Sequence, residues 1–129
     1  MAASLNKVLY VEDEPDIRTI ATMSLQMVGK FKVLACSSGA QAIAAIGEFQ
    51  PDLLLLDVMM PDMDGPATLA RLREHPAGAA VPAVFMTAKV QAGEIDAFRS
   101  LGVVDVIPKP FDPMKLADQL RAIWEAARA

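Results

Sequence analysis

The sequence predicts an α/β fold in which a parallel sheet is covered by helices on both faces. Short apolar segments alternate with segments of helical periodicity five times along the 129 residues, an order typical of βα repeats. The apolar segments are continuous rather than alternating, as in LLLLD at Leu53–Asp57, and such strands are buried on both faces of a parallel sheet. We therefore expect a single domain across residues 1–129, a length that supports a substantial core.

The five predicted strands are short and lie between turn or helix signals. In chain order they are Lys7–Val11, 31–36, Leu53–Asp57, Ala83–Thr87 and 104–108. No linker, repeat or low-complexity stretch interrupts the series, so we assign all five strands to one sheet.

The first predicted helix follows the first strand. Its apolar positions recur at helical spacing, at Ile17, Ile20, Ala21, Leu25 and Val28. Gly29 then supplies a stop. Met23 and Met27 lie off this stripe. Two roles are open for them: peripheral core, since methionine fills irregular gaps, or an adaptable docking patch for a partner.

The other helices are predicted from caps and periodicity. Serine caps open the second helix from Ser37, the third covers residues 67–74, and a weaker one spans residues 93–101. The last begins at about Pro113 and has an inner stripe of Leu116, Leu120 and Ile123.

Composition excludes several classes of protein. A net charge of −4 and a pI near 4.9 argue against a nucleic-acid surface, which requires clustered Lys and Arg. The single cysteine, Cys36, excludes an internal disulfide and suits a reducing compartment. No apolar run approaches the roughly 18 residues of a membrane span, and the N-terminal segment has no secretory signal. We therefore expect a cytoplasmic domain with neither a membrane nor a nucleic-acid partner.

Reactive side chains gather where the predicted strands end. The first strand is followed by Glu12 and Asp13, the third ends in Asp57, the fourth in Thr87, and the fifth leads into Lys109. In open parallel sheets, ligands bind beyond the carboxyl ends of the strands. We therefore expect these side chains to form one site.

The three acids in this set predict a magnesium site. Carboxylates that converge on one edge repel one another, and a divalent cation removes that cost. Oxygen ligands supplied by one or two carboxylates, waters and phosphate oxygens are typical of Mg²⁺. The chain has no His or Cys set for zinc, and we expect the single histidine, His75, to be solvated rather than a ligand.

Four segments in register resemble the response-regulator receiver domain, the CheY-like family. They are VEDEP, LLLLDVMMPDMDG, FMTAK and IPKPF, and the resemblance runs from about Leu5 to Trp124. It implies a flavodoxin-like (βα)5 doubly wound fold whose five-stranded parallel sheet has the order 2-1-3-4-5, with helices on both faces.

The resemblance also assigns roles at the acidic site. Asp57 resembles the phosphoacceptor, which takes a phosphoryl group from a phosphohistidine. Asp13 and Asp57 would bind Mg²⁺ directly, with Glu12 near the ion and the backbone carbonyl of Met59 as a further ligand.

Further roles follow for the fourth and fifth strands. Thr87 resembles the hydroxyl that binds the phosphoryl group, and Ala88 beside it leaves space for the donor. Lys109 resembles the lysine that contacts the phosphoryl group, and its bond to Pro110 is expected to be cis.

These roles imply a phosphorylation-dependent signalling or phosphorelay module of a two-component system. Its partner would be a histidine kinase or a histidine phosphotransfer protein, with a possible downstream protein target. It would not be an enzyme beyond catalysing its own phosphorylation and dephosphorylation. A carboxylate is a competent nucleophile for phosphoryl transfer, and a cation and a lysine offset the charge of the transition state.

Three positions depart from the family pattern. Val106 stands where an aromatic residue usually moves inward as the threonine shifts. Met59 and Lys89 stand two residues beyond Asp57 and Thr87, at positions that often tune dephosphorylation. We expect a slowly dephosphorylating domain that does not use an aromatic switch.

Other interpretations remain open at this point. Asp13 before Pro15 is also a reasonable helix cap, and a trans bond is the usual form before proline. The whole chain is alternatively a phosphorylation-independent interaction module, a pseudo-receiver, in line with Val106. An aspartate-nucleophile phosphohydrolase of the haloacid-dehalogenase type is disfavoured, because it needs an acid where Met59 stands.

Overall fold

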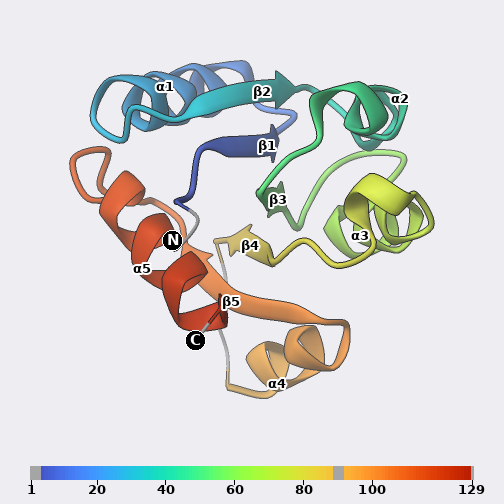
Figure 1. The fold of residues 1–129 in the computed structure, drawn as a ribbon. Coiled ribbons are helices and arrows are strands. Elements are labelled where there is room, and N and C mark those ends of the chain that lie inside the picture. The colour runs from blue at the N-terminus through green and yellow to red at the C-terminus, as the bar shows by residue number, and fades with distance from the viewer. Residues whose placement is uncertain (1–3, 89–91, 129) are drawn as a thin grey trace.

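A computed structural model of the chain describes residues 4–88 and 92–128. Its strands form one parallel sheet in the order β2-β1-β3-β4-β5, which confirms the predicted flavodoxin-like order (Figure 1). The strands are β1 (Lys7–Val11), β2 (Lys32–Cys36), β3 (Leu53–Asp57), β4 (Ala83–Thr87) and β5 (Val103–Pro108). Three of the five match the predicted bounds, and the other two differ by one residue at their first position.

Helices cover both faces of this sheet, as Figure 1 shows. The helices are α1 (Pro15–Met27), α2 (Gly39–Phe49), α3 (Gly65–Arg73), α4 (Ala92–Ser100) and α5 (Leu116–Arg128), with a short 3₁₀ helix, η1 (Pro76–Gly78). Buried residues of α1 and α5 form a core cluster on one face. Those of α2 and α3 form a second cluster on the other face, joined there by Phe98 of α4.

The two central strands beside the site are buried along their whole length. Every residue of β3 and β4 is buried, which explains the unbroken apolar sequence of Leu53–Leu56. Asp57 is the exception in that sequence, and it lies at the carboxyl end of β3. The most buried strand of the fold therefore ends in a carboxylate that is itself buried.

Two helical predictions need correction. The last helix begins at Leu116 rather than near Pro113, because a turn built on Asp112 comes first. The Asp112 side chain accepts a hydrogen bond from the Met114 backbone N–H (2.9 Å), and the Ser24 hydroxyl donates to the Pro113 carbonyl.

The predicted inner stripe of α1 is also only partly right. Ala21 and Leu25 are fully buried, but Ile20 is 49% and Val28 39% exposed. Ser24 is buried instead. The inner face of α1 is therefore rotated toward Ser24. Within the described parts of the chain, none of the helices combines the length and apolar character that a membrane span needs.

Candidate functional site

The sheet brings the predicted residues together at the carboxyl ends of its strands. Val11 of β1 pairs with Leu56 of β3, so Glu12 and Asp57 follow at neighbouring positions. Thr87 ends β4 and is 4% exposed. Its carbonyl accepts a hydrogen bond from the Lys109 backbone N–H (2.9 Å), which ties the end of β5 to the same edge.

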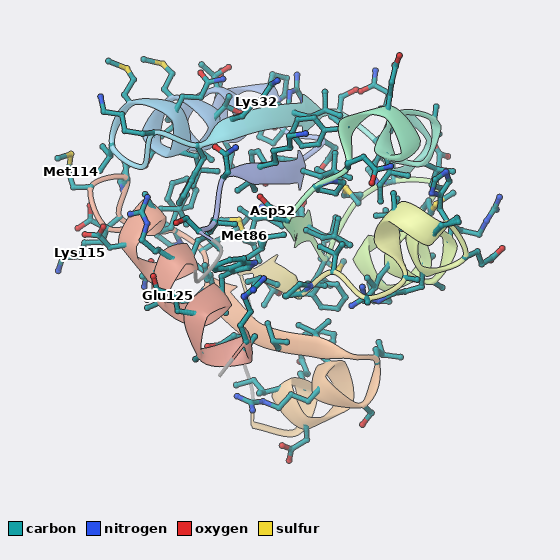
Figure 2. The ribbon with its side chains drawn as sticks, viewed as in Figure 1. Lys32, Asp52, Met86, Met114, Lys115 and Glu125 are labelled. Carbon is teal, nitrogen blue, oxygen red and sulfur yellow. The ribbon has the colours of Figure 1, made fainter. Side chains whose placement is uncertain are left out.

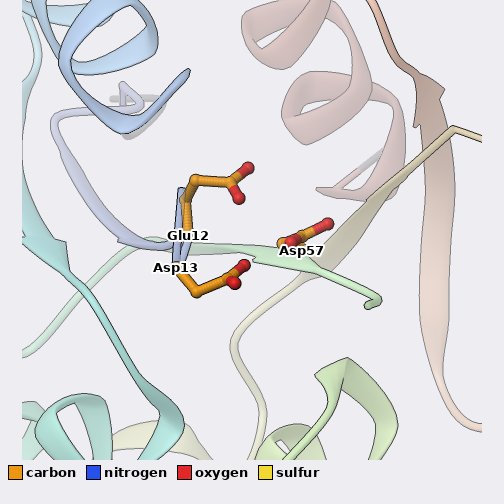
Figure 3. Close-up of side chains that lie close together, drawn as sticks. All are labelled: Glu12, Asp13 and Asp57. Atoms are coloured by element: carbon orange, nitrogen blue, oxygen red, sulfur yellow. The ribbon is translucent and has the colours of Figure 1, made fainter. Parts of the chain in front are cut away.

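Glu12, Asp13 and Asp57 converge on one point. One carboxylate oxygen from each lies within 4.8 Å of the others, and Figure 3 shows the three side chains directed into the same space. Glu12 is 1% and Asp57 4% exposed, whereas Asp13 is half-buried. Three hard oxygen donors at this separation suit a small divalent cation such as Mg²⁺. The residues present therefore fit the predicted metal.

Lys109 lies between two of these acids. Its Nζ is 2.6 Å from Glu12 Oε1 and 3.0 Å from Asp57 Oδ1, to which it donates a hydrogen bond. Burial alone disfavours an ammonium, but the two carboxylates outweigh it and raise the pKa of Lys109. The lysine is therefore held as a cation against the candidate nucleophile. Its bond to Pro110 is cis, which confirms the prediction from the resemblance.

Burial dominates the electrostatics of Asp57. Desolvation raises the pKa of Asp57 to about 7, and the charge of Glu12 adds to the increase, while Lys109 opposes it. In the absence of a cation, the candidate nucleophile thus takes up a proton near neutral pH. A divalent cation held by these acids would favour the ionised form of Asp57.

Contacts with α1 hold the loop after β1, and they show whether Asp13 caps this helix. The cap of α1 is Glu14, whose side chain accepts from the Asp16 backbone N–H (3.4 Å). Asp13 is therefore not the helix cap. The Arg18 side chain of α1 donates a hydrogen bond to the Glu12 backbone carbonyl (2.9 Å). This contact fixes the backbone that carries Glu12 and Asp13.

The loop after β3 is closed by Gly65. Its backbone N–H donates to the Val58 carbonyl (2.9 Å), and a Cβ at this position would lie 2.7 Å from the Asp57 carbonyl oxygen. Asp64 caps α3 by accepting from Ala67 (2.9 Å). Only a glycine permits this close approach, which explains the DG sequence that follows Asp57.

A cavity of about 300 Å³ lies over the acids. Its lining comprises Glu12, Asp13, Glu14, Ile17, Asp57, Met59, Ala88 and Lys109. The Met59 side chain is 76% exposed, and Ala88 is exposed beside Thr87. Both residues therefore lie where the cavity opens to solvent. Lys89 lies outside the described residues.

Val106 and His75, two further positions discussed from the sequence, do not line this cavity. Val106 is partly buried and pairs with Phe85 of β4. The Phe98 ring of α4 lies edge-on to Phe85, with ring centroids 5.0 Å apart. His75 is partly buried rather than solvated, because its Nδ1 accepts from the Ala77 backbone N–H (3.0 Å) and caps η1.

Sequence reasoning missed two residues at this site, Arg18 and Tyr10. Arg18 has no signal of its own in the sequence, because its contact is with backbone carbonyls. Tyr10 did carry a signal. It stands two residues before Glu12, which directly follows β1, and strand side chains alternate between faces, so Tyr10 and Glu12 share a face of the sheet.

The fold is a doubly wound α/β domain with an acidic site at the carboxyl ends of its strands, and the comparisons identify the family. The model of the response regulator receiver domain matches residues 8–121, so the chain belongs to that family. The transcriptional regulatory protein CpxR of Klebsiella pneumoniae is 38% identical over 121 residues, which cover 92% of this chain and 49% of CpxR. The chain spans about half the length of the curated relatives it matches.

Two solved structures are similar along almost their whole length. The chemotaxis protein CheY4 of Vibrio cholerae superposes with a TM-score of 0.85 at 26% identity, covering 93% of this chain and 99% of CheY4. The receiver domain of the sensor histidine kinase PA1611 of Pseudomonas aeruginosa has a TM-score of 0.80 at 27% identity, covering 95% and 99%. That structure contains a magnesium ion coordinated in its active-site cleft.

Proposed function

We propose that this chain is a cytoplasmic, phosphorylation-dependent signalling module of a two-component system, with Asp57 as its phosphoacceptor. The observation that carries this proposal is the arrangement around Asp57. A buried carboxylate at the end of β3 contacts the Lys109 ammonium at 3.0 Å and lies within 4.8 Å of two further acids.

The arrangement suits phosphoryl transfer to a carboxylate. Asp57 attacks phosphorus to form an acyl phosphate, and the phosphohistidine nitrogen of the donor leaves. Lys109 is placed to contact the developing negative charge on the phosphoryl oxygens. Glu12, Asp13, Asp57 and the Met59 carbonyl would hold Mg²⁺, which supplies charge neutralisation at the transferred group. The buried Thr87 hydroxyl is proposed to bind a phosphoryl oxygen afterwards.

The donor is proposed to dock on the exposed face of α1. Ile20, Met23, Met27 and Val28 are exposed, so peripheral core is not the role of the two methionines. With Met114 they line a cavity of about 320 Å³, and Figure 2 shows Met114 directed away from the body of the molecule.

This apolar surface is continuous with the reactive edge. A second cavity of about 190 Å³ shares Ile20 and Pro113 with the first and is lined also by Lys109. A donor protein that brings a phosphohistidine to Asp57 must cover the surface around Lys109. We therefore assign the surface to a histidine kinase or a histidine phosphotransfer protein.

Phosphotransfer from a panel of labelled histidine kinases tests the proposal. We expect rapid transfer from a cognate kinase to the wild-type chain. Changing both Met23 and Met27 to Lys should slow this transfer by roughly tenfold or more, because two desolvated apolar contacts are lost, while labelling by acetyl phosphate stays at the wild-type rate. Equal slowing with both donors would place the effect inside the site and refute the docking surface.

The phosphorylated form is proposed to decay slowly. An acyl phosphate is hydrolysed when water is held in line with phosphorus, and the exposed Met59 side chain offers that water no strong hydrogen bond. A lysine at position 89 has no acceptor with which to take the proton of water. Replacing Met59 by Asn together with Lys89 by Glu should shorten the lifetime of phosphorylated Asp57 several-fold. The lifetime is measured as loss of label after removal of the donor, and an unchanged or longer lifetime contradicts the water-positioning argument.

We also propose that activation does not use an aromatic residue at position 106. Val106 has no ring and pairs with Phe85 in the sheet, and the neighbouring ring contact joins Phe85 to Phe98 of α4. The signal would then pass from Thr87 through backbone and loop motion. The second candidate function, a phosphorylation-independent module, is favoured only by Val106, and it predicts identical partner binding with and without phosphorylation.

A further inference from the structure

A buried hydroxyl lies beneath the acidic cluster and has no role in the chemistry described above. Tyr10 is fully buried in β1, in the core cluster shared with α1 and α5. Its strand neighbours are Ala35 of β2 and Leu55 of β3. Because side chains alternate along a strand, Tyr10 shares its face with Glu12, and Leu55 shares that face with Asp57.

The Tyr10 hydroxyl is buried without a hydrogen-bond partner in the part of the chain that the structure describes. Among the described residues, its oxygen has no hydrogen-bond partner in ordinary geometry. A tyrosine hydroxyl is protonated at neutral pH, so this buried group is a hydrogen-bond donor. A phenylalanine would fill the same space without burying an unpaired hydroxyl. The Glu12 carboxylate, two residues further on the same face of the sheet, is an acceptor that would gain from the extra oxygen.

Glu12 has one contact on each carboxylate oxygen. Oε1 forms the ion pair with Lys109 (2.6 Å), and Oε2 accepts from the Glu14 backbone N–H (3.2 Å). The Glu14 N–H belongs to the loop that follows Glu12, whereas Tyr10 lies two residues earlier, in β1 and in the buried core. A donor on that side would fix the orientation of the carboxylate.

We propose that Tyr10 is a positioning residue for the metal site, whose hydroxyl donates a hydrogen bond to the Glu12 carboxylate and holds that acid toward the bound cation. This inference rests on the proposed function, because it takes the acidic cluster to be a Mg²⁺ site. Hydrogen-bond partners of metal-binding side chains orient them, and their loss typically weakens metal affinity by roughly 10- to 100-fold.

The variant Tyr10→Phe tests the proposal, because it removes one oxygen and keeps the ring. Titration calorimetry with Mg²⁺ should give an affinity roughly tenfold or more weaker than that of the wild type. Trp124→Phe is the matched control. It removes another buried aromatic donor of the same core cluster, one that bonds to the Asp52 carbonyl at the opposite edge of the sheet (3.1 Å). Its Mg²⁺ affinity should equal that of the wild type.

A spectroscopic measurement separates positioning from packing. Tyr10 is the only tyrosine in the chain, so Mg²⁺ should shift the tyrosine absorbance band of the wild type but not that of Asp13→Asn. If Tyr10→Phe is merely less stable and binds Mg²⁺ as the wild type does, the inference is overturned. The inference is also overturned if the tyrosine absorbance band of the wild type does not shift when Mg²⁺ is added. Labelling of Asp57 in the wild type tests the proposed function separately, because it requires no tyrosine hydroxyl.

Discussion

Replacing Asp57 by Asn should abolish labelling of this chain by acetyl phosphate and by a cognate histidine kinase. Asp57 is the acid that ends the buried strand β3 and contacts Lys109 (3.0 Å), and an amide oxygen is too poor a nucleophile to form an acyl phosphate. Label is measured as covalently bound phosphate that resists denaturation. We expect incorporation in the variant to fall to background.

The same experiment tests the metal. With the wild type, removal of Mg²⁺ by a chelator should reduce labelling to near background, because the charge at the transferred group is then uncompensated. The matched control is Asp52→Asn, at the opposite end of β3. Asp52 accepts from the Lys7 backbone N–H (2.9 Å), a contact that Asn retains, so labelling should be unchanged. Equal labelling of wild type and Asp57→Asn would move the phosphorylation site elsewhere.

A stability measurement tests whether Asp57→Asn remains folded. Burial raises the pKa of Asp57 to about 7, above the value near 4 of an unfolded Asp. The folded wild type therefore binds more protons than the unfolded chain between these values, and its stability falls as pH rises through them. In chelator, Asp57→Asn should be more stable than the wild type at pH 8, on the order of 1–3 kcal/mol, and this advantage should disappear near pH 4.

Much of the fold could be predicted because its signals are local. The continuous apolar strands and the helix caps are properties of short segments, and β1, β3 and β4 end where the sequence predicts. The predicted start of α5 near Pro113 is wrong, although proline is acceptable in a first helical turn. In the structure the Pro113 carbonyl accepts a hydrogen bond from the Ser24 hydroxyl of α1. That contact joins positions far apart in the sequence and leaves no periodic pattern.

The candidate site was predictable for a different reason. Parallel strands of one sheet present their carboxyl ends at a common edge, so residue order alone placed Glu12, Asp57 and Lys109 near one another. The position of the Lys109 ammonium between two acids could not be predicted from residue order. The exposure of Met23 and Met27 could not be predicted either, because the rotation of α1 about its axis depends on packing against α5.

Replacing Lys109 by Ala should impair phosphorylation-linked function while leaving a folded domain. The ammonium contacts Glu12 and Asp57 at 2.6 and 3.0 Å, and without it both the carboxylates and the developing charge on the phosphoryl oxygens lose a partner. Removing one preorganised donor of this kind typically costs about 100- to 1,000-fold in rate. We expect labelling by acetyl phosphate to slow by about this factor, and the change in partner binding that accompanies phosphorylation to be lost.

Two controls separate this role from a structural one. Lys115→Ala removes an exposed lysine on the turn before α5, so it should label and respond as the wild type does. Far-UV circular dichroism of Lys109→Ala should match the wild type, because Pro110 and the backbone bond from Lys109 to Thr87 (2.9 Å) do not depend on the side chain. If phosphorylated Lys109→Ala changes partner binding as the wild type does, the ammonium only neutralises Glu12 and Asp57 in the unphosphorylated state. The signal would then have to pass through Thr87 alone.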